Sequence, residues 1–147
     1  MKKTINRKEI LALGLMMTVI SAIAQNNSRG TLTIKADNFS NNKGQAVIKL
    51  FQKDDDVFGD AFIQLSETIK NGTVVFTFEN IPFEDYAATI FHDENSNGIL
   101  DHKFAFPNEP MGFSNDWRFT VFSGMPNFTK LSFKFSILKS EYQININ

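Results

Sequence analysis

Residues 71–78 have the sequence Asn-Gly-Thr-Val-Val-Phe-Thr-Phe, and this stretch decides the fold class. Its first two residues both tolerate a positive φ, which a two-residue hairpin turn requires. After the turn, Val74, Phe76 and Phe78 alternate with residues of the opposite face, which is the period of a strand with one buried side. The stretch therefore predicts an antiparallel β-protein with these three side chains in its core.

Other segments show the same two-residue period and are separated by turn-forming residues. The predicted strands are 31–36, 45–51, 61–65 (a short edge strand or a packed loop), 86–92, 117–122 (a strand or an extended return), 131–137 and 141–146. The clearest alternation predicts that Leu131, Phe133, Phe135 and Ile137 face inward. About seven short strands predict an all-β, antiparallel β-sandwich of immunoglobulin or transthyretin type, with one long ordered loop at residues 93–116.

The first 24 residues are typical of a secretory signal. Four basic residues precede an apolar run, Ile10 to Ala24, which is shorter than the roughly 20 residues of a membrane-spanning helix. Ala22-Ile23-Ala24 matches a cleavage site, so the mature chain is expected to begin at Gln25 and to form a single domain, residues 25–147. We therefore expect a secreted protein, periplasmic or at the cell surface, without a stable membrane span.

The composition of the mature chain narrows its partners. The signal holds four of the 15 Lys and Arg residues and one of the 16 acidic residues, so 11 basic and 15 acidic residues remain, a net charge of −4. This balance argues against nucleic-acid binding, which requires basic patches. The chain has no Cys, so an exported domain must be held by its core, by a metal or by both. The 16 Phe residues, all in the mature part, supply that core.

Residues 93–101, Asp-Glu-Asn-Ser-Asn-Gly-Ile-Leu-Asp, are the most specific chemical signal in the chain. They match the start of the calcium-loop pattern D-x-[DN]-x-[DN]-G, which gathers oxygen ligands around a hard cation. The predicted ligands are Asp93, Asn95, Asn97, the carbonyl of Ile99 and Asp101, with Glu109 as an extra ligand and Asp116 as the next candidate for that place. An EF-hand is disfavoured, because a strand precedes the loop and Phe104 replaces the bidentate Glu of its twelfth position.

A metal-free loop is the alternative, since Asn and Asp also form Asx-turns. Magnesium is disfavoured because it prefers rigid octahedral sites that retain several waters. Calcium, the expected cofactor, would order residues 93–116.

His92 and His102 flank this loop and suggest a second kind of chemistry. A transition-metal pair is conceivable, but the chain offers no third His or Cys for a closed zinc site. Ser96 lies between them without the G-x-S-x-G surroundings of a hydrolytic nucleophile. We therefore expect no enzyme, and the alternative is a small hydrolase or ligand carrier that uses the loop with His92 or His102. A cleft beside these residues would favour that alternative.

Residues 92–101 and the stretch 107–115, Pro-Asn-Glu-Pro-Met-Gly-Phe-Ser-Asn, carry a family resemblance. Together with Tyr86 and Ala87, they resemble the pattern Y-A-x-x-x-x-H-D-E-N-x-N-G-x-L-D, then P-x-E-x-x-G-F-S-N, of the bacterial secreted family called domain of unknown function 2141. Asp85 departs from the Gly usual in the family at that position. The loop also resembles the calcium-binding B-type repeats of bacterial surface adhesins and nearby transthyretin-like sandwiches. The resemblance implies the fold and the cation, and it transfers no activity.

Taken together, these features predict a secreted, non-enzymatic binding or structural module. Calcium would order its 93–116 loop, which would present Phe113 and Trp117 to an unknown protein or glycan partner.

Overall fold

The computed structural model describes residues 29–104, 106–120 and 122–147. The predicted signal at residues 1–24 and its cleavage site lie outside these ranges, so export stays a prediction. Within the described ranges, no helix is long and apolar enough to cross a membrane.

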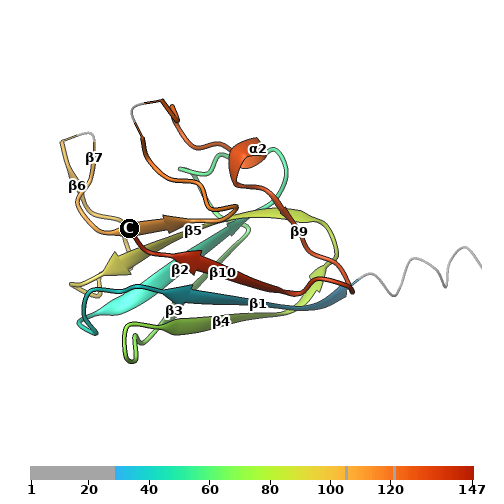
Figure 1. Ribbon diagram of the computed structural model, residues 1–147, viewed down its shortest axis with the longest axis horizontal. Helices are drawn as coiled ribbons and strands as arrows, with labels where there is room; N and C mark the ends of the chain where they lie inside the picture. The colour runs from blue at the N-terminus through green and yellow to red at the C-terminus, as the bar shows by residue number, and fades with distance from the viewer. Residues whose placement is uncertain (1–28, 105, 121) are drawn as a thin grey trace, which may run out of the picture.

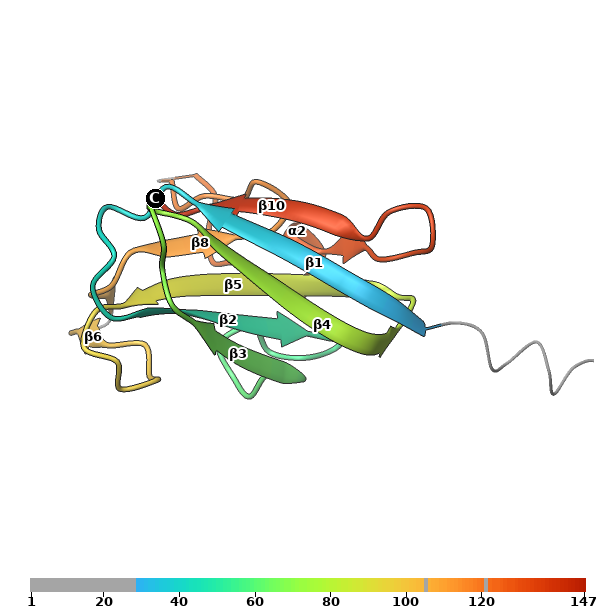
Figure 2. The ribbon, with the colours of Figure 1, turned by 90° about the horizontal axis from the view of Figure 1, so that it is seen from below.

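Two β-sheets form the body of the molecule (Figures 1 and 2). The first sheet has the order β10-β1-β4 and consists of β1 (Arg29–Asp37), β4 (Val74–Pro82) and β10 (Glu141–Asn145). The second has the order β3-β2-β5-β8 and consists of β2 (Gln45–Phe51), β3 (Ile63–Glu67), β5 (Asp85–Asp93) and β8 (Met111–Phe113), with β9 (Phe133–Lys134) also paired to β5. A small hairpin of β6 (His102–Lys103) and β7 (Phe106–Pro107) and one helical turn, α2 (Phe128–Leu131), complete the described elements. The all-β sandwich is thereby confirmed.

The two sheets enclose one hydrophobic core. Alternate residues of each strand point into it, and Val74, Phe76 and Phe78 are all buried there, as their spacing predicts. The turn before β4 is also as predicted: Asn71 and Gly72 have φ of 52° and 71°, and the flanking residues exchange two backbone hydrogen bonds of 3.0 and 3.1 Å.

Strand β10 pairs with β1 in parallel, from Thr33 opposite Glu141 to Asp37 opposite Asn145, while the other sheet pairings are antiparallel among the described residues. The reason is topological. Strand β9 pairs with β5 in the second sheet, and the chain then crosses to the first sheet through a tight turn at Ser136–Lys139. The sandwich is thus antiparallel as predicted, apart from the parallel pairing of β10 with β1 at this edge.

The central strands of the second sheet, β2 and β5, are buried on both faces, which the strand pattern did not predict. Its outer face carries a separate apolar cluster, covered by the chain around residues 52–61 and by the 114–131 segment. The cluster consists of Val47, Phe51, Val57, Ala87, Phe91, Met111, Phe113 and Leu131. Figure 1 shows α2 and the loops beside it above this face. Strand β5 is consequently buried from Tyr86 to Asp93.

The predicted strand at 131–137 is wrong in most of its length. Asn127 caps the helical turn α2, because its side chain accepts a hydrogen bond of 3.1 Å from the Lys130 amide. Leu131 therefore ends a helix and is buried in the outer cluster, while Ile137 lies in the turn before β10 and is 83% exposed. Phe133 and Phe135 are buried between the sheets as predicted. The described residues of 117–122 likewise form no strand.

Candidate cation loop and adjoining cleft

Asp93, the last residue of β5, anchors the candidate loop from inside the protein. Its side chain has no exposed surface and accepts three hydrogen bonds. Oδ2 accepts from the Gly98 amide at 2.7 Å and from Gln45 Nε2 at 2.8 Å, and Oδ1 accepts from the Asn97 amide at 3.1 Å. Burial alone would raise the pKa of Asp93, but these hydrogen bonds outweigh it and lower the pKa. The carboxylate is therefore ionised at neutral pH and holds the loop closed around itself.

The two predicted amide ligands fold back over this anchor. Asn95 Oδ1 accepts from the Asn97 amide at 3.0 Å, and Asn97 Oδ1 accepts from the Ile99 amide at 2.8 Å. Their Nδ2 groups donate to the two carboxylate oxygens of Asp101, at 2.6 and 3.2 Å respectively. Gly98 takes φ +75° between them, as the sharp turn at this loop position requires. Asp93, Asn95, Asn97 and Asp101 thus converge on one turn, while the Ile99 residue is 68% exposed on its outer side.

Glu109 reaches the same turn from the far side of the β6–β7 hairpin. Its Oε2 accepts a hydrogen bond of 3.2 Å from the Asp101 amide, and the Asn108 amide donates to the Asp101 carbonyl at 2.8 Å. Burial raises the pKa of Glu109, and the nearby negative charges of Asp93 and Asp101 raise it further. A cation between these three carboxylates would relieve that repulsion. Asp116, the other candidate, lies beyond β8 in the separate 114–127 loop.

In the structure itself, the loop is held by its own hydrogen bonds. The side-chain amide oxygens of Asn95 and Asn97 face backbone amides, and their nitrogens face Asp101. Among the described residues, no group of three or more His, Cys, Asp and Glu side chains is arranged to hold a metal ion. Binding of calcium would therefore require the Asp101 and amide side chains to turn their oxygens toward a common centre.

The two His residues occupy different environments. His92 is fully buried in β5, and its Nε2 lies 2.8 Å from the Lys43 carbonyl, so Nε2 carries a proton and donates. Its Nδ1 has no hydrogen-bond partner among the described residues, and its ring lies edge-on to Phe39 at 5.4 Å. His102 is exposed on β6. His92 therefore has a structural setting, and only His102 is open to a ligand.

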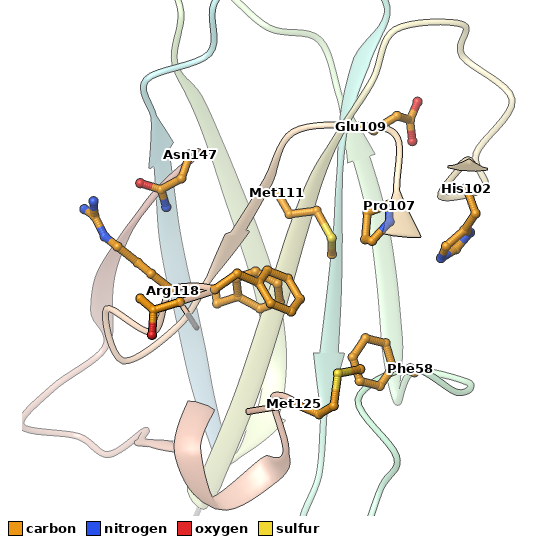
Figure 3. Close-up of a pocket in the computed structure, with 11 residues that line it drawn as sticks. Phe58, His102, Pro107, Glu109, Met111, Arg118, Met125 and Asn147 are labelled. Atoms are coloured by element: carbon orange, nitrogen blue, oxygen red, sulfur yellow. The ribbon is translucent and has the colours of Figure 1, made fainter. Parts of the chain in front are cut away.

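A cleft of about 970 Å³ adjoins the loop, between the β6–β7 hairpin and the 114–127 loop (Figure 3). Its lining residues are Phe58, His102, Pro107, Glu109, Met111, Phe113, Arg118, Phe119, Thr120, Met125 and Asn147. The prediction that the loop presents Phe113 on its surface to a partner is wrong. Phe113 is 5% exposed and packs edge-on against Trp117 and Phe119, with ring centroids 4.8 and 5.2 Å apart.

The sequence reasoning missed the cleft because its described lining comes from four separate places in the chain without a common motif: Phe58, residues 102–113, residues 118–125 and Asn147. It also missed the role of Ser114. This buried side chain donates to the Leu131 carbonyl at 2.6 Å and accepts from the Ala88 amide at 2.9 Å, which ties the outer loop to β5. The G-F-S-N sequence at 112–115 was the sequence signal from which this hydrogen-bonded link could have been predicted.

The fold and the site define a β-sandwich with a second, loop-built layer over one sheet and an Asx-rich loop at the end of its central strand. The chain belongs to the family DUF2141, described as an uncharacterized protein conserved in bacteria, whose model matches residues 34–143. A search of the curated proteins and a search of the solved structures each found no match.

Proposed function

We propose that the protein is a secreted, non-enzymatic binding or structural module whose 93–116 loop is ordered by calcium. The observation that carries this proposal is the convergence of Asp93, Asn95, Asn97, Asp101 and Glu109 on one turn. Each of these five side chains has at least one oxygen of the kind that a hard cation prefers as a ligand. Three of them are carboxylates, so the loop without a cation concentrates negative charge.

The buried anchor supports the same proposal. Asp93 is fixed before any ion arrives, because Gln45 and two backbone amides hold its carboxylate in place. A fixed first ligand lowers the ordering cost of binding. The exposed ligands can then rearrange around the ion, while β5 and the sandwich stay unchanged.

Against a hydrolase stands the burial of His92, which leaves it no access to a substrate or to water. His102 is accessible, but no nucleophile or second base is hydrogen-bonded to it among the described residues. The cleft beside His102 instead favours the ligand carrier, which is the other part of that alternative.

Thermal unfolding in chelator and in calcium tests the proposal. Extracellular calcium modules bind with a Kd of about 10⁻⁴–10⁻³ M, so about 10 mM calcium should stabilise the folded state by roughly 1.4–2.7 kcal/mol. Limited proteolysis should show cleavage within 93–116 in chelator and protection in calcium. Magnesium at the same concentration is the control for general ionic effects. Identical melting curves and identical protease patterns in chelator and in calcium would contradict the proposal.

A further inference from the structure

The cleft beside the cation loop is surrounded by apolar side chains that remain largely exposed. Phe58, Phe119 and Met125 are 46%, 49% and 64% exposed, yet they surround one concavity whose base is Met111. Single exposed apolar side chains are ordinary, whereas a group of them around a cavity marks a binding site. The volume of about 970 Å³ lies at the upper end of the range for small-ligand pockets.

The polar side chains of the cleft lie on its two sides, with the guanidinium group of Arg118 on one of them. Figure 3 shows Arg118 and Asn147 on one side, His102 on the opposite side and Met111 between them. Glu109 is the only acidic side chain among the described lining residues, and its carboxylate accepts a hydrogen bond from the Asp101 amide of the cation loop. Among the described residues, Arg118 has no carboxylate within ion-pair distance. One end of an apolar cleft thus carries a guanidinium group that forms no ion pair within the described part of the chain.

We propose that this cleft binds an amphiphile with one apolar chain and an anionic oxygen head group. The chain lies over Met111, Phe113, Phe119 and Met125, and the head group pairs with Arg118. A guanidinium group matches both carboxylate and phosphate geometry, so a fatty-acid-like and a phosphate-headed ligand share this chemistry. The proposal goes beyond the calcium-ordered loop and does not depend on it.

The chain contains its own reporter for this test. Trp117 is the only tryptophan, and its ring centroid lies 4.8 Å from those of Phe113 and Phe119, both of which line the cleft. A brominated chain that enters the cleft should therefore quench the tryptophan fluorescence.

The experiment titrates the mature chain with dodecanoate, dodecyl phosphate, dodecanol and dodecyltrimethylammonium below their micelle concentrations. Affinity is measured by calorimetry, and insertion by quenching with 12-bromododecanoate. We expect saturable one-to-one binding of at least one anion, about tenfold or more weaker binding of the alcohol, and no binding of the cation. The stronger of the two anions identifies the head group. Each titration is repeated in chelator and in calcium. Failure of the amphiphile proposal is then distinguishable from failure of the calcium proposal.

Three variants make the site assignment specific. Arg118→Met should weaken binding of the anion by roughly ten- to hundredfold, because a charge-assisted hydrogen bond is lost. Phe119→Ser should weaken binding of the alcohol and of the anion alike. Because Phe119 also packs on Phe113 and Trp117, a melting curve of the variant checks that the fold is retained. Arg29→Met is the matched control, since this Arg lies on β1 and bonds to the Asn80 carbonyl away from the cleft. Absence of binding by both anions, equal affinity for the alcohol and the anions, or unchanged affinity in Arg118→Met would overturn the proposal.

Discussion

Replacement of Asp93 by Asn tests the anchor of the loop with the smallest change of shape. The wild-type carboxylate accepts from Gln45 and Gly98 on Oδ2 and from Asn97 on Oδ1. The variant side chain has one acceptor oxygen and one amide nitrogen. If its oxygen replaces Oδ2, two bonds survive and the nitrogen meets the Asn97 amide, donor against donor. If the oxygen replaces Oδ1, two bonds are lost.

The magnitude follows from this count. A hydrogen bond to a charged group contributes about 1.5–3 kcal/mol and a neutral one about 1 kcal/mol. The better orientation of Asp93→Asn therefore loses one charge-assisted bond and weakens two others. Relief of repulsion with Glu109 offsets part of that loss. We expect the free energy of unfolding in chelator to fall by about 2–4 kcal/mol.

Urea unfolding at pH 7, in chelator and in calcium, is the assay. Asp93→Asn should be destabilised in chelator and should lose its stabilisation by calcium. The control is Glu94→Gln, in the same loop, whose partially exposed side chain bonds to Asn41 and lies 3.7 Å from Lys43. It should change stability little and keep the full response to calcium. Equal effects of the two substitutions would refute the reasoning, because they would show that the buried anchor has no special role.

Three further predictions concern the surroundings of the site. Gly44→Ala should lower the free energy of unfolding by at least about 2 kcal/mol, because left-handed strain costs about 1–2 kcal/mol and the new Cβ would lie 2.1 Å from the Asp93 carbonyl oxygen. Gly98→Ala is the control: its φ is similar and the space around its Cβ is open, so only the strain should be lost. Equal losses of the two variants in urea unfolding would contradict the close approach at Gly44. Glu109→Gln should raise stability in chelator at pH 7, because the raised pKa of Glu109 means that folding disfavours its ionised form. The same substitution should weaken calcium binding by about tenfold or more. A destabilised variant with unchanged calcium affinity would argue against a role of Glu109 as a ligand. Burial raises the pKa of Asp37, but hydrogen bonds from Lys35, Thr73 and Gln143 outweigh burial and lower that pKa. The stability that Asp37 contributes is therefore present above about pH 3.8 and is lost as the pH falls through its folded-state pKa. Asp37→Asn should lose less stability below about pH 4 than the wild type, and an unchanged acid profile would count against this account.

Local sequence patterns predicted the strands of the sandwich correctly where apolar residues alternate along a strand that has only one buried face. Asn71 and Gly72 placed the turn before β4, and the alternation of Val74, Phe76 and Phe78 placed their side chains in the core. The same reasoning failed at 131–137, because a cap at Asn127 starts a helical turn there. An alternating pattern does not reveal whether a buried side chain enters the central core or the outer cluster, and Leu131 enters the latter.

The loop residues were predictable because their spacing is local. Asp93, Asn95, Asn97 and Asp101 lie within nine residues, so one turn brings them together, and Glu109 follows on the return of a short hairpin. The cleft was not predictable, because only the tertiary fold brings Phe58 and Arg118 to the same cavity. The burial of His92 was hidden because its covering residues come from elsewhere in the chain: its ring packs on Phe39 and bonds to the Lys43 carbonyl.

The most direct test of the account is a calcium titration of residues 25–147 followed by two-dimensional NMR of the backbone amides. The account predicts saturable shifts with a Kd of about 10⁻⁴–10⁻³ M, confined to residues 93–101 and the neighbourhood of Glu109, and their loss in Asp93→Asn. Shifts that do not saturate, or that spread over the acidic surface and leave the amides of Asn97 and Gly98 unmoved, would contradict a calcium site in this loop.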